Sequence, residues 1–215
     1  MKLLTIGDSF TYGDELLDRR AAWPVVLANK MGWSLTNLGV NSCSNTGMIR
    51  RVVEHIDQHD VIIVGWSHYD RLEVADEYGT YEIWPSKRNI PNIKECPWRA
   101  ELGKHYTLYH NHKYAYRQYL INVLLFQSLA QLKNKKYLMI DAFGNNTDRA
   151  NYAETNTDLI SQIDTQHFVG WPAESMLSIA GDAPRARSNT GHFLELGHQR
   201  VAERIADEIA KHIRH

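Results

Sequence analysis

The sequence has few cysteines and no excess of charge of either sign. Its 215 residues include only two cysteines, Cys43 and Cys96, which form neither a disulfide framework nor a metal-binding pair. We therefore expect a reducing compartment. The 24 basic and 25 acidic side chains give a formal net charge of -1, so no overall positive field would attract nucleic acid.

Long apolar runs are also lacking. The amino terminus offers only Leu3–Ile6 before Gly7, which is too short for the apolar region of a signal peptide or for a membrane span. We therefore expect a cytoplasmic protein that does not contact membranes. The hydrophobic content of 43% is nevertheless ample for a buried core.

Short apolar runs bounded by turn residues recur along the chain. Three of them, Leu3–Ile6, Val61–Val64 and Tyr137–Ile140, have the composition of strands buried on both faces of a parallel sheet. Helical spacing appears between and after them, over residues 21–31, 46–58, 114–132 and 196–213. This alternation predicts a doubly wound α/β fold, in which ligands bind beyond the carboxyl ends of the strands.

We expect a single domain over residues 1–215 with one long excursion at about residues 76–113. The excursion has little periodicity and is rich in aromatic residues, namely Tyr78, Tyr81, Trp84, Trp98, Tyr106 and Tyr109. Its length exceeds that of an ordinary connection, so it is either a lid over a site or an Ω-like loop packed on the body.

The first motif with chemical content is the segment Gly7–Gly13, which comes directly after the first predicted strand and reads Gly-Asp-Ser-Phe-Thr-Tyr-Gly. Ser9 stands in this turn, where a substrate can reach it and backbone N–H groups point into the same cleft. Such a position suits a nucleophile. Asp8 more plausibly braces the turn than reacts.

The second motif runs from His192 to His198, just ahead of the last predicted helix. A base for Ser9 must come from a segment that returns to the same edge of the sheet, and the loop leading into the last helix can do so. His192 is the candidate base. His198 lies inside the helical pattern, which suits packing or capping better than proton transfer.

Together these motifs resemble the SGNH (GDSL-type) hydrolase superfamily, with Gly-Asp-Ser near the start and a histidine six residues before a Gly-His pair near the end. Phe193 stands where the family commonly has proline. The resemblance implies a three-layer α/β/α, flavodoxin-like fold and ester hydrolysis through a Ser–His pair. Ser44-Asn45, Gly65-Trp-Ser67 and a nearby arginine look like a subgroup often encoded by phages and bacteria.

The resemblance also implies an oxyanion hole formed by the N–H of Ser9, an N–H of a second block and an Asn side chain of a third. The second-block donor falls on Ser42 or, in another register, on Gly39. In the third block Ser67 replaces the asparagine, and a hydroxyl is a shorter donor. Asn41 or Asn45 could substitute for it.

The acid of the triad is the largest departure from the family. Asn189 stands three residues before His192, where the family normally has aspartate. An Asp-to-Asn change at this position of a triad costs about 10⁴ in kcat. The remaining possibilities are a dyad oriented by a backbone carbonyl or by the Asn189 oxygen, Asp182 acting as the acid, and a module without catalysis.

These observations predict an esterase or carbohydrate-type deacylase that acts on a small-molecule or carbohydrate ester and needs no cofactor. The alternative is a catalytically impaired binding module or a virion-associated structural protein. We expect no metal, because His110 and His112, with His105 nearby, have no adjacent acidic ligand pattern and read as solvated loop histidines. The oligomeric state stays open.

Overall fold

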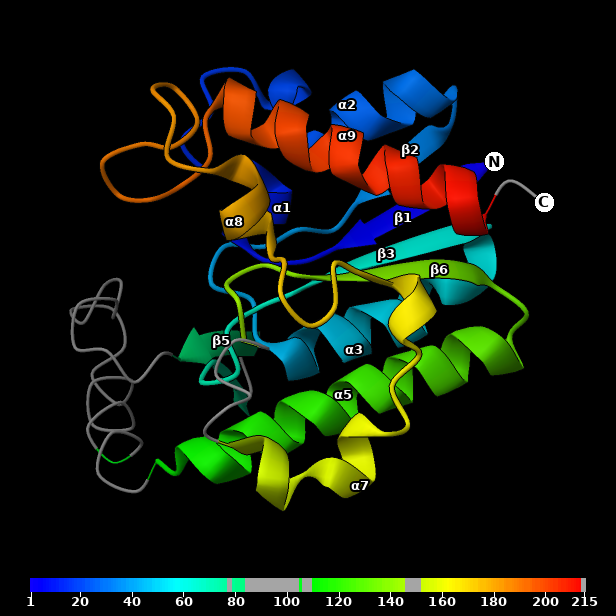
Figure 1. Ribbon diagram of the computed structural model, residues 1–215, viewed down its shortest axis with the longest axis vertical. Coiled ribbons are helices and arrows are strands. Elements are labelled where there is room, and N and C mark those ends of the chain that lie inside the picture. The colour runs from blue at the N-terminus through cyan, green and yellow to red at the C-terminus, as the bar shows by residue number, and fades with distance from the viewer. Residues whose placement is uncertain (77–78, 84–104, 106–109, 146–151, 214–215) are drawn as a thin grey trace.

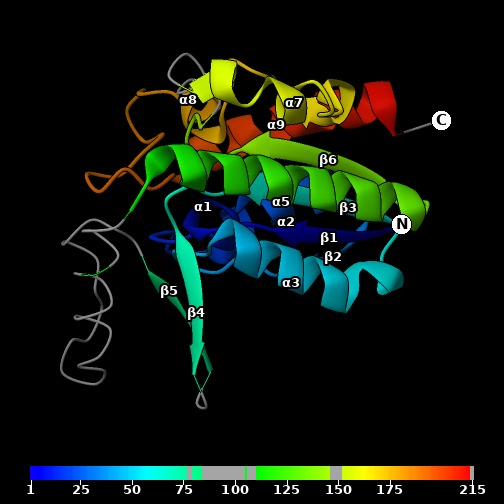
Figure 2. The ribbon, with the colours of Figure 1, turned by 90° about the horizontal axis from the view of Figure 1, so that it is seen from below.

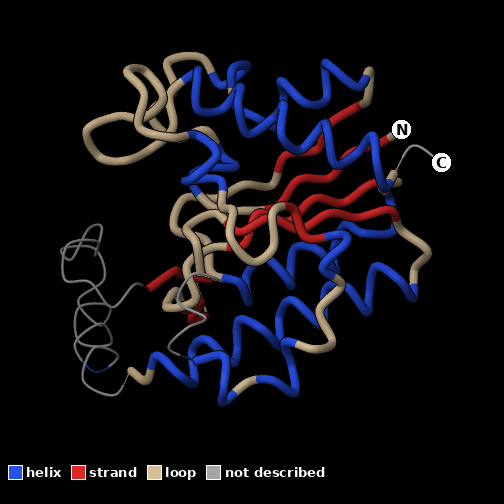
Figure 3. Tube along the Cα trace, in the orientation of Figure 1, coloured by secondary structure: helices blue, strands red, loops and turns tan. Residues whose placement is uncertain are grey.

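The computed structural model describes residues 1–76, 79–83, 105, 110–145 and 152–213. Its centre is a five-stranded parallel sheet in the order β2-β1-β3-β6-β7 (Figure 3). The strands are β1 (Lys2–Ile6), β2 (Ser34–Asn37), β3 (Val61–Trp66), β6 (Lys136–Asp141) and β7 (Phe168–Val169). Counted within the sheet alone, this order is 2-1-3-4-5, the flavodoxin-like arrangement.

Helices cover both faces of the sheet and complete three layers (Figures 1 and 2). One face carries α3 (Asn45–His55) and α5 (His112–Leu132), with α7 (Thr157–Ile160) packed on α5. The other face carries α2 (Trp23–Met31) and α9 (Glu195–His212), with α8 (Met176–Ala180) packed on α9. The three-layer α/β fold predicted from the sequence is thus confirmed.

The side chains of the central strands alternate between the two layers of helices. Leu4, Ile62 and Met139 belong to the core on the α3 and α5 side, whereas their neighbours Leu3 and Ile63 belong to the core on the α2 and α9 side. All five are fully buried. Because successive strand residues point to opposite faces, a run buried on both faces must be apolar throughout, which is why these strands could be found in the sequence.

Short elements connect the layers, namely α1 (Ser9–Tyr12) and the 3₁₀ turns Arg19–Ala21, Ile56–Gln58, Ala153–Thr155 and Thr165–His167. The sequence analysis did not predict the short strand β7. It also did not predict the antiparallel hairpin of β4 (Leu72–Asp76) and β5 (Gly79–Ile83). Most of the rest of the aromatic excursion, namely residues 84–104 and 106–109, lies outside the described residues, so the lid and the Ω-like loop both stay predictions.

A membrane-spanning helix would need a long apolar stretch. None of the described helices is long and apolar enough to cross a membrane.

Candidate active site

The turn that carries Ser9 begins where β1 ends at the carboxyl edge of the sheet. Asp8 caps α1, because its Oδ1 accepts the N–H of Phe10 at 3.0 Å. Gly7 packs so closely that an added Cβ would lie 2.1 Å from the Thr11 hydroxyl, and Gly13 ends the helix with φ of +83°. Ser9 is therefore held in one position, and it is only 5% exposed.

A buried ion pair between Asp8 and Arg71 holds this turn in place. The Arg71 Nη1 lies 2.7 Å from Asp8 Oδ2 and 2.6 Å from the hydroxyl of Ser67, and the charged side chains are 3% and 0% exposed. Burial raises the pKa of the Asp8 carboxyl, and the Arg71 guanidinium opposes that shift. Asp8 thus braces the turn, and Arg71 links it to the segment after β3.

The same contacts place the Ser67 hydroxyl away from its expected oxyanion role. This hydroxyl donates its single proton to Asp8 Oδ2 at 3.2 Å while it accepts from Arg71. Asn45 is occupied as well, since its amide bonds the Ser67 N–H at 2.9 Å and the Ser67 carbonyl at 3.0 Å. The Ser67 hydroxyl therefore joins the third block to Asp8 in the Ser9 turn, and Asn45 joins the second block to the third, instead of pointing a donor toward Ser9.

The two backbone N–H groups of the second block that could serve as oxyanion donors, those of Gly39 and Ser42, differ in whether they are already hydrogen-bonded. The N–H of Gly39 donates to the Asn37 side chain at 3.0 Å, and an added Cβ at Gly39 would lie 2.5 Å from the Tyr12 nitrogen. Ser42 has a positive φ of 61°, and within the described part of the chain its N–H makes no hydrogen bond. Of the two registers, the geometry favours Ser42 as a donor.

His192 lies beside the Ser9 turn. Its ring meets that of Phe10 edge-on at 5.9 Å between centroids, and Phe193 stacks on the other side of Phe10 at 4.0 Å. Phe193, which replaces the family's proline, is fully buried. The structure thus brings Ser9 and His192 to the same edge of the sheet, although no hydrogen bond joins them. Such bonds often form only when substrate is bound.

The carboxylate beside His192 comes from the Ser9 turn and not from the carboxyl-terminal segment. Glu15 Oε1 lies 3.1 Å from His192 Nδ1. The backbone of Glu15 has a positive φ of 63°. Hydrogen bonds from Ser188 and Thr190, together with His192, hold the pKa of Glu15 below its ordinary value. A second carboxylate, that of Asp14, lies 3.6 Å from His192 Nε2.

The structure places the two expected partners of His192 elsewhere. Asn189 lies exposed at the tip of a tight loop, which is closed by the Ser188 N–H bonding the His192 carbonyl at 2.8 Å. The carboxylate of Asp182 is 85% exposed and pairs with Arg187. Asp182 is thus held by another cation, and the carboxylate oxygen that contacts Nδ1 of His192 belongs to Glu15, beside the Thr190 hydroxyl at 3.2 Å from that nitrogen.

Sequence reasoning missed Glu15 because the family resemblance directed the search for an acid to the residues before His192. A signal existed, since two acidic residues, Asp14 and Glu15, come directly after the glycine that ends the Ser9 turn. Glu15 and His192 are nevertheless 177 positions apart, and only the fold shows that they meet.

His198 has the structural role expected for it. It is fully buried, and its Nδ1 accepts the N–H of Trp23 at 3.2 Å, at the start of α2. Because α2 has no side-chain cap from its own N-cap residue, this bond satisfies an otherwise unpaired donor. Burial lowers the pKa of His198 to about 4, so the ring stays neutral.

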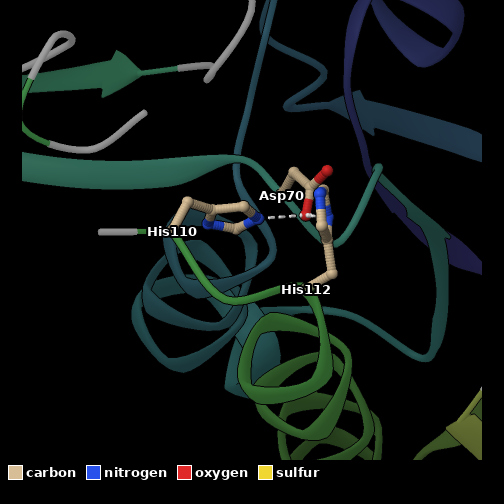
Figure 4. A group of neighbouring side chains, drawn as sticks. All are labelled: Asp70, His110 and His112. Atoms are coloured by element: carbon tan, nitrogen blue, oxygen red, sulfur yellow. Dashed lines mark hydrogen bonds and ion pairs between the residues drawn. The ribbon is translucent and has the colours of Figure 1, made fainter. Parts of the chain in front are cut away.

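The description of His110 as a solvated histidine was wrong, and so was the expectation that neither His110 nor His112 has an acidic neighbour; His112 is solvated, with its side chain 56% exposed. The His110 side chain is only 6% exposed, and its Nε2 lies 2.6 Å from Asp70 Oδ1 (Figure 4). His112 Nδ1 lies 3.1 Å from the same oxygen. Asp70 is about 40 positions away in the sequence, so the spacing of the histidines could not reveal it.

Comparison with known proteins gives one family and a group of structural relatives. The model of a "Family of unknown function (DUF6071)" matches residues 13–215, and no curated protein matches. The fold is that of a lipolytic protein assigned to the G-D-S-L family from Desulfitobacterium hafniense DCB-2 (14% identity, TM-score 0.58, 96% of this chain and 98% of that one).

Two esterases have the same fold. The psychrotrophic esterase EstA from Pseudoalteromonas sp., in a structure inhibited by monoethylphosphonate, is 15% identical with a TM-score of 0.57 over 98% of this chain and 97% of its own. A two-domain esterase (CEX) active on acetylated mannans is 15% identical with a TM-score of 0.53 over 98% of this chain and 49% of its own.

These likenesses confirm the resemblance that the Gly7–Gly13 and His192–His198 motifs indicated. The family model covers all but the first 12 residues, and the two structural relatives cover 96% and 98% of the chain. The chain therefore belongs to the family of unknown function DUF6071, and its fold is that of the SGNH (GDSL-type) hydrolases.

Proposed function

We propose that this chain is a serine esterase or carbohydrate-type deacylase in which Ser9 is the nucleophile and His192 the base. The observation that carries the proposal is the Glu15–His192 pair, with 3.1 Å between Oε1 and Nδ1, beside the turn that holds Ser9. A nucleophile, an imidazole and a carboxylate that orients the imidazole form the constellation of serine hydrolases.

Glu15 supplies what Asn189 lacks in this scheme. A carboxylate that accepts the Nδ1–H of His192 fixes the tautomer in which Nε2 carries the lone pair. Nε2 then takes the proton of Ser9 as the hydroxyl oxygen attacks the ester carbonyl, and it later returns a proton to the leaving alcohol. The lowered pKa of Glu15 keeps this carboxylate ionised near neutral pH.

The oxyanion of the tetrahedral intermediate would be held by backbone donors. The N–H groups of Ser9 and Ser42 make no hydrogen bond within the described part of the chain, so both can donate to a substrate oxygen. The Gly39 N–H and the Ser67 hydroxyl are engaged with Asn37 and Asp8. Losing one such donor typically costs about 10²–10³ in kcat, so a hole with few donors implies a modest rate.

The substrate is an ester of a small molecule or of a carbohydrate in this proposal. Acetylated mannans, on which the relative CEX acts, offer a small acyl group on a sugar hydroxyl. Acetylated mannan oligosaccharides and short-chain chromogenic esters are therefore the first compounds to assay.

The test is active-site labelling with a fluorophosphonate, because the relative EstA has been solved with a phosphonate inhibitor. The wild type is compared with Ser9→Ala, His192→Ala and Glu15→Gln. Ser161→Ala serves as the matched control, since Ser161 is an exposed serine bonded only to a backbone carbonyl. We expect labelling in the wild type and the control, none in Ser9→Ala, and slow labelling in the other two.

The alternative function predicts a different pattern. A binding module or a virion-associated structural protein that keeps the fold without catalysis would leave the folded wild type unlabelled. Labelling that persists in Ser9→Ala would place the nucleophile elsewhere and overturn the proposed site.

A further inference from the structure

A second cluster of polar side chains lies beyond the end of β3, apart from Ser9 and His192. His110 Nε2 and His112 Nδ1 lie 2.6 Å and 3.1 Å from the same oxygen, Oδ1 of Asp70 (Figure 4). The three potential ligand atoms are all within 4.8 Å of one another. Two imidazoles that converge on one carboxylate form an arrangement typical of transition-metal sites.

We propose that Asp70, His110 and His112 bind a divalent transition-metal ion, with Zn²⁺ as the first choice. Imidazole nitrogen and carboxylate oxygen are both common zinc ligands, at about 2.0–2.2 Å from the ion. Three protein ligands with one further position suffice for a tetrahedral ion. The chain thus carries a metal site that is separate from the ester-hydrolysing centre.

The two contacts with Asp70 are compatible with such an ion. Ligand atoms around a tetrahedral zinc lie about 3.3–3.5 Å apart, given the bond lengths above. The two contacts of 2.6 Å and 3.1 Å would therefore lengthen by less than about 1 Å when the ion enters. His68 Nδ1, at 3.6 Å from Asp70 Oδ2, is near enough to serve as an outer partner.

Burial and access also suit a metal ion. The side chains of Asp70 and His110 are 8% and 6% exposed, so an ion held by them would be largely shielded from water. His112 is 56% exposed and gives the ion a path from solvent. His110 also lines a cavity of about 390 Å³ with Asn45 and Arg71.

The position of the cluster in the chain indicates what the ion would do. Asp70 lies just after β3, whereas His110 and His112 stand at the start of α5, so Asp70 and the nearer histidine are 40 positions apart in the chain. A metal that joins the two ends closes this loop, and such closure stabilises more as the loop lengthens. An ion bound only by the folded chain adds its binding free energy to stability. We therefore assign the site a bracing role.

The full chain, stripped of metal with EDTA and dialysed, would be titrated with Zn²⁺ by isothermal calorimetry. Thermal unfolding would be measured with and without zinc. We expect one zinc ion per wild-type chain and a higher midpoint of unfolding. Loss of an outer-shell partner weakens metal binding by roughly 10–100-fold. Because His112 is a direct ligand in this proposal, we expect His112→Ala to weaken zinc binding by more than that. Because His112 is more than half exposed, this variant should fold, which circular dichroism would verify.

His167→Ala is the matched control. His167 also contacts an aspartate, Asp164, at 2.8 Å, but that pair includes one histidine only. The control should bind zinc like the wild type. Co²⁺ provides a second readout, since a tetrahedral ion with these ligands absorbs in the visible range and the absorption should vanish in His110→Ala. No saturable binding to the wild type, or equal binding in His112→Ala, would overturn the proposal.

Discussion

Two histidines six positions apart have opposite environments in this protein. His192 lies on a loop at the edge of the sheet with its side chain 25% exposed, and it contacts the carboxylate of Glu15. His198 lies one turn into α9, fully buried, and it accepts the backbone N–H of Trp23. The first environment favours an imidazole that exchanges protons, whereas the second keeps the ring neutral.

The difference comes from the partner and from access to water. In the proposed mechanism, a carboxylate next to Nδ1 would stabilise the imidazolium that forms when His192 accepts a proton. A buried N–H donor next to Nδ1 of His198 requires its lone pair, so protonation would break that bond and bury a charge. Spacing in the sequence marks both residues, but only their surroundings separate a proposed base from a helix cap.

Replacing each histidine in turn gives the largest contrast. We expect His192→Ala to lose ester hydrolysis by about 10⁴-fold or more, because the nucleophile loses its base. Its free energy of unfolding should change little, since the side chain is partly exposed. His198→Ala should instead lose about 2–4 kcal/mol of stability, from a cavity and an unpaired Trp23 N–H, while the folded protein stays active.

Both quantities can be measured on the same preparations, with kcat/KM on a chromogenic acetate ester and unfolding in urea. An active His192→Ala, or an inactive but stable His198→Ala, would reverse the two assignments.

The carboxylate partner gives the next largest effect. Glu15→Gln retains the size of the side chain but removes its negative charge, and its NH2 group can face Nδ1 and select the wrong tautomer of His192. We expect kcat to fall by about 10²–10⁴, as when a triad carboxylate becomes an amide. Rates at saturating ester, with KM measured in parallel, would detect this, and KM should change little.

The control for this experiment is Asp14→Asn. Asp14 is the other carboxylate near His192, but it lies 3.6 Å from Nε2, the nitrogen that must face Ser9. Its loss should cost much less than the loss of Glu15. If Asp14→Asn proved the more damaging change, the orienting carboxylate would be Asp14 and the ring would be used in the opposite sense.

The pH dependence of stability tests whether the His198 ring is neutral in the folded protein. Its pKa is about 4 in the folded protein against an ordinary value of 6.5, so the unfolded chain binds the proton more tightly. The neutral ring therefore contributes stability above pH 6.5, and this contribution is lost as the pH falls from 6.5 toward 4. The full shift corresponds to about 3 kcal/mol.

His198→Asn tests this contribution, because an amide oxygen can still accept the Trp23 N–H but does not titrate in this range. Urea unfolding at pH 7 and pH 5 should show a smaller loss of stability in the variant than in the wild type. Equal losses would mean that His198 is not the group that is protonated on unfolding. The carboxylates of Asp164 and Glu208 do not compete in this range, because their lowered pKa values affect stability only near and below the ordinary values of 3.8 and 4.5.

The sequence was sufficient to predict the fold and to place Ser9 and His192 at the same edge of the sheet. Strands such as Val61–Trp66 are apolar at every position because both faces are buried, and such a run is visible without a structure. Parallel strands then bring the loops after their carboxyl ends to one edge of the sheet. Ser9 and His192 could be placed there because the family resemblance names both positions.

The partners of these residues could not be found in the same way. Asp8 pairs with Arg71 across 63 positions, and Glu15 meets His192 across 177. Contacts of this length depend on loop conformation, such as the positive φ of Glu15, which no periodicity reports. The donor role expected for Ser67 could not be tested from the sequence either, because its hydroxyl bonds Asp8 in the buried ion pair.

The smallest effect is expected at Asn189, where the sequence alone would suggest the largest gain. Restoring the family's aspartate with Asn189→Asp should change kcat by less than about threefold, because the side chain lies exposed at a loop tip and Nδ1 of His192 already contacts Glu15. The informative measurement is the same substitution in the Glu15→Gln background. A rescue there, with no gain in the wild type, would show that either carboxylate can orient the ring. A large gain in the wild type would show that Glu15 does not perform this role.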